Sequence, residues 1–188
     1  MLLQEAIHGR RSMPVLGMPM PNAEQLEAVF LAAARAPDHR LLRPWRYLVL
    51  TGDGLSQLGQ AFVDGMSELD PERALRDHQR LLDMPHRAPM IVVAILSLNA
   101  HPTVPEWEQW LSLGAGVQNM LLTLHDQGFA GMWRTGDLVA SLAVKSFLGL
   151  QDHEQIAGFI YVGSAKGEKA APALPEKLWQ HWPAVESK

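Results

Sequence analysis

The sequence predicts an α+β fold in which helices flank a central mixed β-sheet. Segments 45–51, 89–98 and 156–162 combine β-branched, aromatic and aliphatic residues over the length of a strand. Long helical patterns separate these segments, without the regular strand–helix alternation of a doubly wound sheet. Segment 89–98 is apolar at nearly every position, which is typical of a central strand buried on both faces.

Capping and breaking residues set the ends of the predicted helices. Helical periodicity runs through residues 2–7, 22–36, 55–84, 106–127 and 138–148. Asn22 is a good N-cap, Pro37 and Gly128 each end a helix, and Asp70-Pro71 breaks the third segment in two. The helix over 106–127 is apolar on more than one face, so we expect its own core and a partner to bury it together.

The length of 188 residues fits one domain that spans residues 1–188. Residues 163–188 contain three prolines and two tryptophans and have no periodicity. We therefore expect an extended C-terminal tail that lies on a surface, either its own or a partner's.

The composition excludes several classes of protein. The net charge is −4 and the chain has no basic run, which argues against binding to nucleic acid. No segment approaches the roughly 20 apolar residues of a membrane span, and the first residues lack the pattern of a secretion signal. We therefore expect a cytoplasmic protein without nucleic-acid or membrane partners.

Several familiar catalytic and metal-binding signatures are absent from the sequence. The chain has no cysteine, and its eight histidines show no His-Glu-x-x-His spacing, so we expect no metal site. The glycine pairs Gly52/Gly54 and Gly114/Gly116 lack the third glycine of a dinucleotide fingerprint. If a dihydronicotinamide binds, we expect it to bind without a Rossmann unit.

Arg10-Arg11-Ser12 follows the first helix and forms the first candidate site. Guanidinium groups, a hydroxyl and nearby backbone N–H groups together suit a phosphate monoester, which carries about two negative charges. The alternative is that the two arginines face solvent or cap the carbonyl groups of the helix.

Arg35 and His39 lie in a second polar segment, which leads through Arg43-Pro44 to Trp45. Cations and an aromatic ring in one loop can close over a planar, electron-poor ring and stabilise its reduced anionic form. The alternative is a polar connection between a helix and a strand, in which the prolines set the turns and Trp45 begins a core strand.

Met132, Trp133 and Arg134 stand between glycines in segment 128–136 and form the third candidate site. Glycine lets the backbone approach a flat ligand and offer peptide N–H groups to its ring acceptors. A glycine-rich hairpin or the start of a strand is an equally good interpretation.

Taken in order, these motifs resemble the nitroreductase superfamily, and within it the small bacterial members of the YdjA type. The resemblance covers most of residues 1–165. It implies a nitroreductase-like fold, an intertwined homodimer, and FMN bound at each of two sites in the subunit interface. It also implies that NADH or NADPH is the electron donor and that a small molecule is the acceptor.

The resemblance assigns a role to each motif. It implies that the phosphate and ribityl chain of FMN are bound by Arg10, Arg11 and Ser12. It implies that the isoalloxazine is lined by Met132, Trp133 and Arg134. It also implies that Arg35 and His39 reach the flavin bound mainly by the other subunit.

The sequence departs from larger members of the family after the first motif. Those members carry a further basic residue there and others near the C-terminus, whereas Met13 and Pro14 follow Ser12 in this chain. Lys166 and Lys169 are candidates to replace them.

The reaction that the resemblance implies is a ping-pong hydride transfer through flavin to nitroaromatic, quinone or similar conjugated electrophiles. No catalytic side chain is expected, because the flavin N5 position carries the chemistry. The alternatives are a dehalogenation-type or flavin-modifying reaction on the same fold, or a flavin binder without turnover. Relatives with those other reactions carry added lid segments, and segment 64–84 is short for one.

Overall fold

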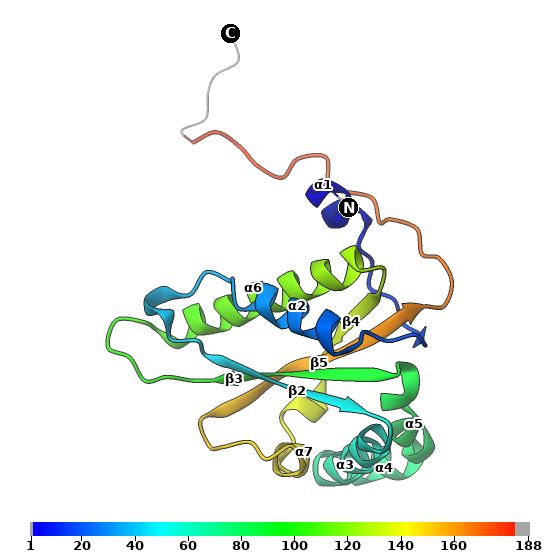
Figure 1. Cartoon of the computed structure of the whole chain (residues 1–188). Helices are drawn as coiled ribbons and strands as arrows, with labels where there is room; N and C mark the ends of the chain where they lie inside the picture. Colours follow the sequence, from blue (N-terminus) through cyan, green and yellow to red (C-terminus); the bar gives the residue numbers. More distant parts are fainter. Residues whose placement is uncertain (1, 183–188) are drawn as a thin grey trace.

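The computed structural model describes residues 2–182 and has the expected α+β architecture (Figure 1). A five-stranded sheet lies between two layers of helices. The strands are β1 (Leu16–Gly17), β2 (Trp45–Thr51), β3 (Met90–Ser97), β4 (Ala130–Arg134) and β5 (Glu154–Ala165). Their order is β1-β5-β3-β2, and β4 also pairs with β5. Within the described residues, no helix combines the length and apolarity that crossing a membrane requires.

The sheet is antiparallel in each of its ladders. Among the described residues, parallel pairing is limited to one bridge between Ser12 and Gly131, so the sheet is less mixed than the sequence predicts. The strand over 45–51 is confirmed, and β3 and β5 confirm the other two strands, although β5 extends beyond 156–162 at both ends. β4 decides between the interpretations of segment 128–136 in favour of a strand. β1 carries no signal in the sequence, because its two residues pair only with the end of β5.

Two layers of helices enclose the sheet (Figure 1). α2 and α6 pack on one face, and α3, α5 and α7 pack on the other. The helices are α1 (Leu3–Gly9), α2 (Ala23–Ala33), α3 (Asp53–Leu69), α4 (Pro71–Arg76), α5 (His78–Asp83), α6 (Glu106–Asp126) and α7 (Leu142–Phe147). Asn22 caps α2 as predicted: its side chain accepts from the Gln25 N–H at 2.9 Å, and the Gln25 side chain accepts from the Asn22 N–H at 3.0 Å.

Local capping divides two of the predicted helices. The break at Asp70 is confirmed, since its side chain caps α4, but the segment divides again at Asp77, between α4 and α5. The predicted helix over 138–148 is a 3₁₀ turn followed by α7. Ser141 starts this new helix by accepting from the Val144 N–H, and Glu68 on α3 accepts from two N–H groups in its first turn. Apolar periodicity alone does not reveal such caps.

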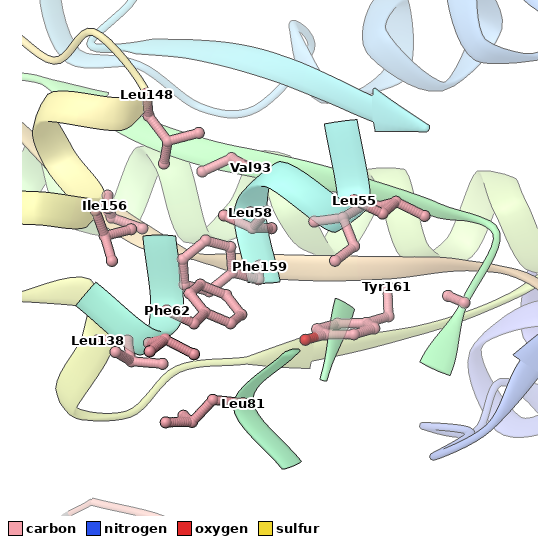
Figure 2. Close-up of a cluster of buried hydrophobic side chains, with 14 of the residues drawn as sticks. Leu55, Leu58, Phe62, Leu81, Val93, Leu138, Leu148, Ile156, Phe159 and Tyr161 are labelled. Atoms are coloured by element: carbon pink, nitrogen blue, oxygen red, sulfur yellow. The ribbon is translucent and has the colours of Figure 1, made fainter. Parts of the chain in front are cut away.

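β3 supplies both halves of the core, as its apolar run predicts. Ile91, Val93 and Ile95 face the layer of α3, α5 and α7, where the rings of Phe62 and Phe159 meet edge to face at 5.1 Å (Figure 2). The alternate residues of the strand face α2 and α6 on the other side of the sheet. Burial on both faces explains why this strand shows no polar alternation.

After β5, the predicted tail continues without helix or strand. In the described part, residues 166–182 run past α1 and away from the sheet (Figure 1). The tail is largely exposed, including the large apolar side chains of Leu174, Leu178, Trp179 and Trp182. Residues 183–188 of the predicted tail lie outside the described residues.

A buried carboxylate ties β2 to β5 across β3. Arg46 on β2 donates from Nε and Nη2 to the two carboxylate oxygens of Glu154, at 2.6 and 2.7 Å. Glu154 is only 5% exposed, and the Gln151 N–H also donates to it at 2.9 Å. The hydrogen bond from Arg46 outweighs the desolvation of the carboxylate and lowers the pKa of Glu154 to about 2.

This lowered pKa predicts that stability falls in acid. An unfolded glutamate titrates near pH 4.3, roughly, so the pair stabilises the fold fully above that pH. The contribution is lost as the pH falls toward the folded-state pKa of about 2. We expect Glu154→Gln to lower the free energy of unfolding at pH 7 by about 1–3 kcal/mol and to flatten its pH dependence in this window. Urea denaturation at several pH values measures both effects. The exposed Glu27→Gln on α2 is the control, and an unchanged acid response in Glu154→Gln would contradict the assignment.

Candidate functional site

The Arg10–Ser12 segment lies beside β4. Ser12 forms a parallel bridge with Gly131, and the Met13 N–H donates to the Gly131 carbonyl at 3.3 Å. Gly131 has little room for a side chain, since a Cβ there would lie 2.8 Å from Cδ2 of Leu121 on α6. The first and third motifs of the sequence therefore meet at one strand of the sheet.

Arg10, Arg11 and Ser12 are half-buried at the end of α1. Arg10 Nη1 lies 3.5 Å from Ser12 Oγ, and Arg11 Nη1 donates to the carbonyls of His8 and Arg10 at 2.5 and 2.9 Å. Arg11 thus caps the end of α1, as one interpretation of the sequence predicts. Its Nε is buried without a hydrogen-bond partner in residues 2–182. A donor in this condition favours an acceptor from outside the chain.

Lys169 of the tail adds a second kind of cation to this segment. Its Nζ donates to the Ser12 carbonyl at 3.1 Å. The Lys166 side chain lies instead against Gly17 on β1. Of the two lysines that the sequence offers, Lys169 is therefore the one beside the first motif.

Trp133 on β4 folds against the neighbouring strand. Its Nε1 donates to the Ala157 carbonyl on β5 at 3.1 Å. Gly158 makes this contact possible, because a Cβ at that position would lie 2.2 Å from Trp133 Nε1 and its φ of +148° disfavours other residues. Glycine at position 158 thus leaves room for the indole of Trp133 to lie against β5.

Arg134 links β4 to the segment that directly follows the first motif. Its Nη2 donates to the Pro14 carbonyl at 3.1 Å, and its guanidinium carbon lies 5.2 Å from the centre of the Tyr161 ring. Burial lowers the pKa of Arg134, and the positive charge of Arg87 lowers it further. Its Nε is buried and has no hydrogen-bond partner in the described chain.

Arg35 and His39 do not join this group within one chain. Both are exposed on the segment after α2, and His39 Nδ1 lies 2.6 Å from Oε2 of Glu108 on α6. Trp45 is partly buried and packs against the core cluster that contains residues of α2 and α6. The motif is therefore a connection from a helix to a strand that begins at Trp45, as one interpretation predicts, although this strand is at the edge of the sheet and only partly buried.

The loop after His39 is held in an unusual conformation. Arg40, Leu41 and Arg43 have φ values of 65°, 54° and 49°, a region that residues other than glycine seldom adopt. The Arg43 N–H donates to Oδ2 of Asp38 at 2.7 Å and holds the turn. Such strain persists only where surrounding contacts impose it, and it is frequent at ligand sites.

α6 separates the two groups of candidate residues. Near its beginning, Ser112 Oγ donates to the carbonyl of Pro37, which precedes His39, at 2.6 Å. Near its end, the ring of His125 lies against Gly9, which precedes Arg10. At a rise of about 1.5 Å per residue, these two points on the helix are about 20 Å apart.

A cavity of about 390 Å³ lies between β4, β5 and the helices α3, α4 and α5. Met132, Trp133 and Arg134 form one of its walls. Sequence reasoning missed its other polar residues, namely Arg73, Asp77, Arg80, Arg87, Asp137 and Tyr161. A charged helical pattern is typical of a solvated surface, and no local signal relates it to a distant strand.

Comparison with known proteins finds a matching family, similar sequences and similar structures. Residues 7–164 match the model of the Nitroreductase family. YdjA of Escherichia coli (strain K12), named as a candidate NAD(P)H nitroreductase, is 34% identical over 160 residues, which cover 85% of this chain and 86% of YdjA.

Solved structures share the fold. A nitroreductase-like family protein from Bacillus cereus has a TM-score of 0.82 at 22% identity and covers 93% of this chain and 91% of its own. The FMN and NADPH-dependent nitroreductase NfnB from Sphigopyxis sp. strain HMH has a TM-score of 0.75 at 20% identity, over 97% of this chain and 100% of its own. The match to the family model over most of the sequence, together with these relatives, shows that the chain belongs to the nitroreductase family.

Proposed function

We propose that the chain is an FMN-dependent oxidoreductase that uses NADH or NADPH to reduce nitroaromatics, quinones or similar conjugated electrophiles. The observation that carries the proposal is the meeting of the Arg10–Ser12 segment with β4, through the Ser12–Gly131 bridge. The names of similar proteins support the cofactors: YdjA is named for NAD(P)H, and NfnB for FMN and NADPH.

The residues beside β4 fit both ends of FMN. Arg10, Arg11 and Lys169 supply positive charge for a phosphate. The Nε of Arg11, which has no partner among residues 2–182, supplies a buried donor. The glycine-flanked strand with Trp133 and Arg134 suits a flat ring, and the buried Nε of Arg134 lacks a partner in the described chain. Bound FMN would accept a hydride and pass the electrons on, while the protein supplies placement and charge.

The arrangement assigns each group a task in this proposal. Arg10 and Ser12 bind the remote phosphate, so they hold the cofactor without touching the reacting atoms. Arg134 presents a charge beside the ring, held in place by the Pro14 carbonyl. In this proposal, the electron donor and the electron acceptor bind in turn at the same exposed side of the flavin ring.

We further propose that the protein is a homodimer that packs through the outer face of α6. Trp107 and Leu111 lie one turn apart on that face and are 61% and 65% exposed. α1, which lies against the other end of α6, exposes Leu3 and Ile7. Exposed apolar side chains in this number mark an interaction surface. A partner there would allow Arg35 and His39 of one subunit to approach the site of the other.

Arg10→Ala should weaken FMN binding by about tenfold or more, because it removes a charged contact to phosphate. Turnover at saturating FMN should stay near that of the wild type, since the phosphate is remote from the reacting ring. Fluorescence titration with FMN and steady-state rates measure the two quantities. Arg76→Ala removes the same charge from the exposed side of α4 and is the control. Unchanged FMN affinity in Arg10→Ala would remove Arg10 from the site.

Steady-state kinetics should give parallel double-reciprocal lines for the donor and the acceptor. This pattern is expected when the donor and the acceptor bind in turn at one site. Without oxygen, NADH or NADPH should bleach the visible absorbance of the loaded protein, and an acceptor should restore it. Intersecting lines would contradict a shared binding site. Flavin that neither donor bleaches would indicate a flavin binder without turnover.

Leu111→Glu should shift the protein from dimer to monomer, because it places a charge in the proposed apolar interface. It should also weaken FMN binding, since the partner's residues are then lost from the site. Sedimentation velocity and FMN titration measure these effects. Leu75→Glu on α4 is the matched control, because Leu75 is also exposed but lies on the other side of the sheet. A wild-type monomer that binds FMN fully would contradict the dimer proposal.

A further inference from the structure

The cavity beside β4 carries more positive than negative charge. Four arginines and two aspartates line it, which leaves a formal charge of +2 in a chain whose net charge is −4. The aspartates are already paired: Arg73 Nη1 lies 2.7 Å from Oδ2 of Asp137, and Arg80 Nη1 lies 3.6 Å from Oδ2 of Asp77. The surplus positive charge therefore comes from the remaining two arginines.

Arg87 and Arg134 are these two arginines. Neither forms an ion pair among residues 2–182, and both are half-buried. Both line the same cavity, and the charge of Arg87 is one cause of the lowered pKa of Arg134, after its burial. Two like charges in a partly desolvated wall are unfavourable unless an anion offsets them.

Tyr161 adds another donor to the same cavity. Its ring lies beneath the Arg134 guanidinium. Burial raises the pKa of Tyr161, so the hydroxyl stays protonated and can donate at neutral pH. Phe62, Phe159 and Leu81 form apolar walls around it, and Figure 2 shows these side chains gathered on one side of the sheet. Hydrogen-bond donors next to apolar walls suit a flat ring that bears a carboxylate.

We infer that this cavity selects anionic electron acceptors, namely flat aromatic or quinone compounds that carry a carboxylate. Arg87 binds that carboxylate, and the charge of Arg134 beside the flavin ring adds to the positive potential of the cavity. A volume of about 390 Å³ admits a substituted ring of this kind. The inference rests on the proposed function, because the wall formed by Met132, Trp133 and Arg134 is also the proposed lining of the flavin site.

The test compares 4-nitrobenzoate with 4-nitrobenzamide, an uncharged compound of similar shape, on the FMN-loaded protein. We expect a higher kcat/KM for 4-nitrobenzoate. Arg87→Met should lower that value by about tenfold and leave the value for the amide unchanged. Arg87→Lys keeps the charge but loses the guanidinium fork, so it should retain part of the preference. Lys145→Met on α7 removes a charge outside the cavity and should change neither value.

Calorimetric titration with benzoate separates binding from turnover, because benzoate has no nitro group to reduce. We expect it to bind the loaded protein, and Arg87→Met to raise its Kd by about tenfold. Benzoate binding without reduction of either nitro compound would support the anion site and contradict the proposed function. Reduction of both compounds at equal kcat/KM, without benzoate binding, would contradict the anion site alone.

Two further measurements show whether the positive charges of the cavity bind another ligand. If Arg87→Met raises only the KM of NADH or NADPH, the charges bind the phosphates of the donor. If it shifts the midpoint potential of bound FMN and leaves the Kd of benzoate unchanged, they act on the cofactor. Either result would overturn the inference.

Discussion

The pairing of β4 with β5 is the constraint on which the candidate site depends. It places Trp133 and Arg134 beside a strand whose other edge is already occupied by β3, so β4 has a fixed position relative to the core. Its second neighbour is the Arg10–Ser12 segment, which joins it through Ser12 and Gly131. Without this pairing, the cationic residues at the end of α1 would face solvent and have no partner surface. The site is thus a consequence of strand order more than of any single motif.

Burial then determines what the charges can do. Arg46 is paired with Glu154, which lowers the pKa of that carboxylate and makes the pair structural. Arg11 and Arg134 each keep a buried Nε without a partner in the described chain, although other atoms of the same side chains bond to backbone carbonyls. A guanidinium that is anchored at one atom and unsatisfied at another is preorganised for an anion. This difference distinguishes Arg46, which has a structural role, from Arg11 and Arg134, which we propose to bind ligands.

α6 connects the site to the proposed dimer. One face of this helix packs into the core through residues such as Val117 and Met120, while Trp107 and Leu111 remain exposed on another. The same helix holds the His39 segment about 20 Å from the first motif. A partner on the exposed face would explain both features, since it would cover the apolar side chains and bring in the residues that one chain leaves distant.

The sequence by itself determined the elements whose signals are local. The strand over 45–51, the apolar strand β3, the Asn22 cap and the long helix α6 follow from periodicity and capping, and the ordered motifs pointed to the family. Only the tertiary structure decided the antiparallel register, the strand β4 and the cavity. Arg87 and Arg134 are 47 positions apart in the chain. The residues around either arginine do not predict that the two line the same cavity. Their proximity arises because β4 pairs with β5 beneath the helices, and contacts between distant segments depend on packing, which local propensity does not encode.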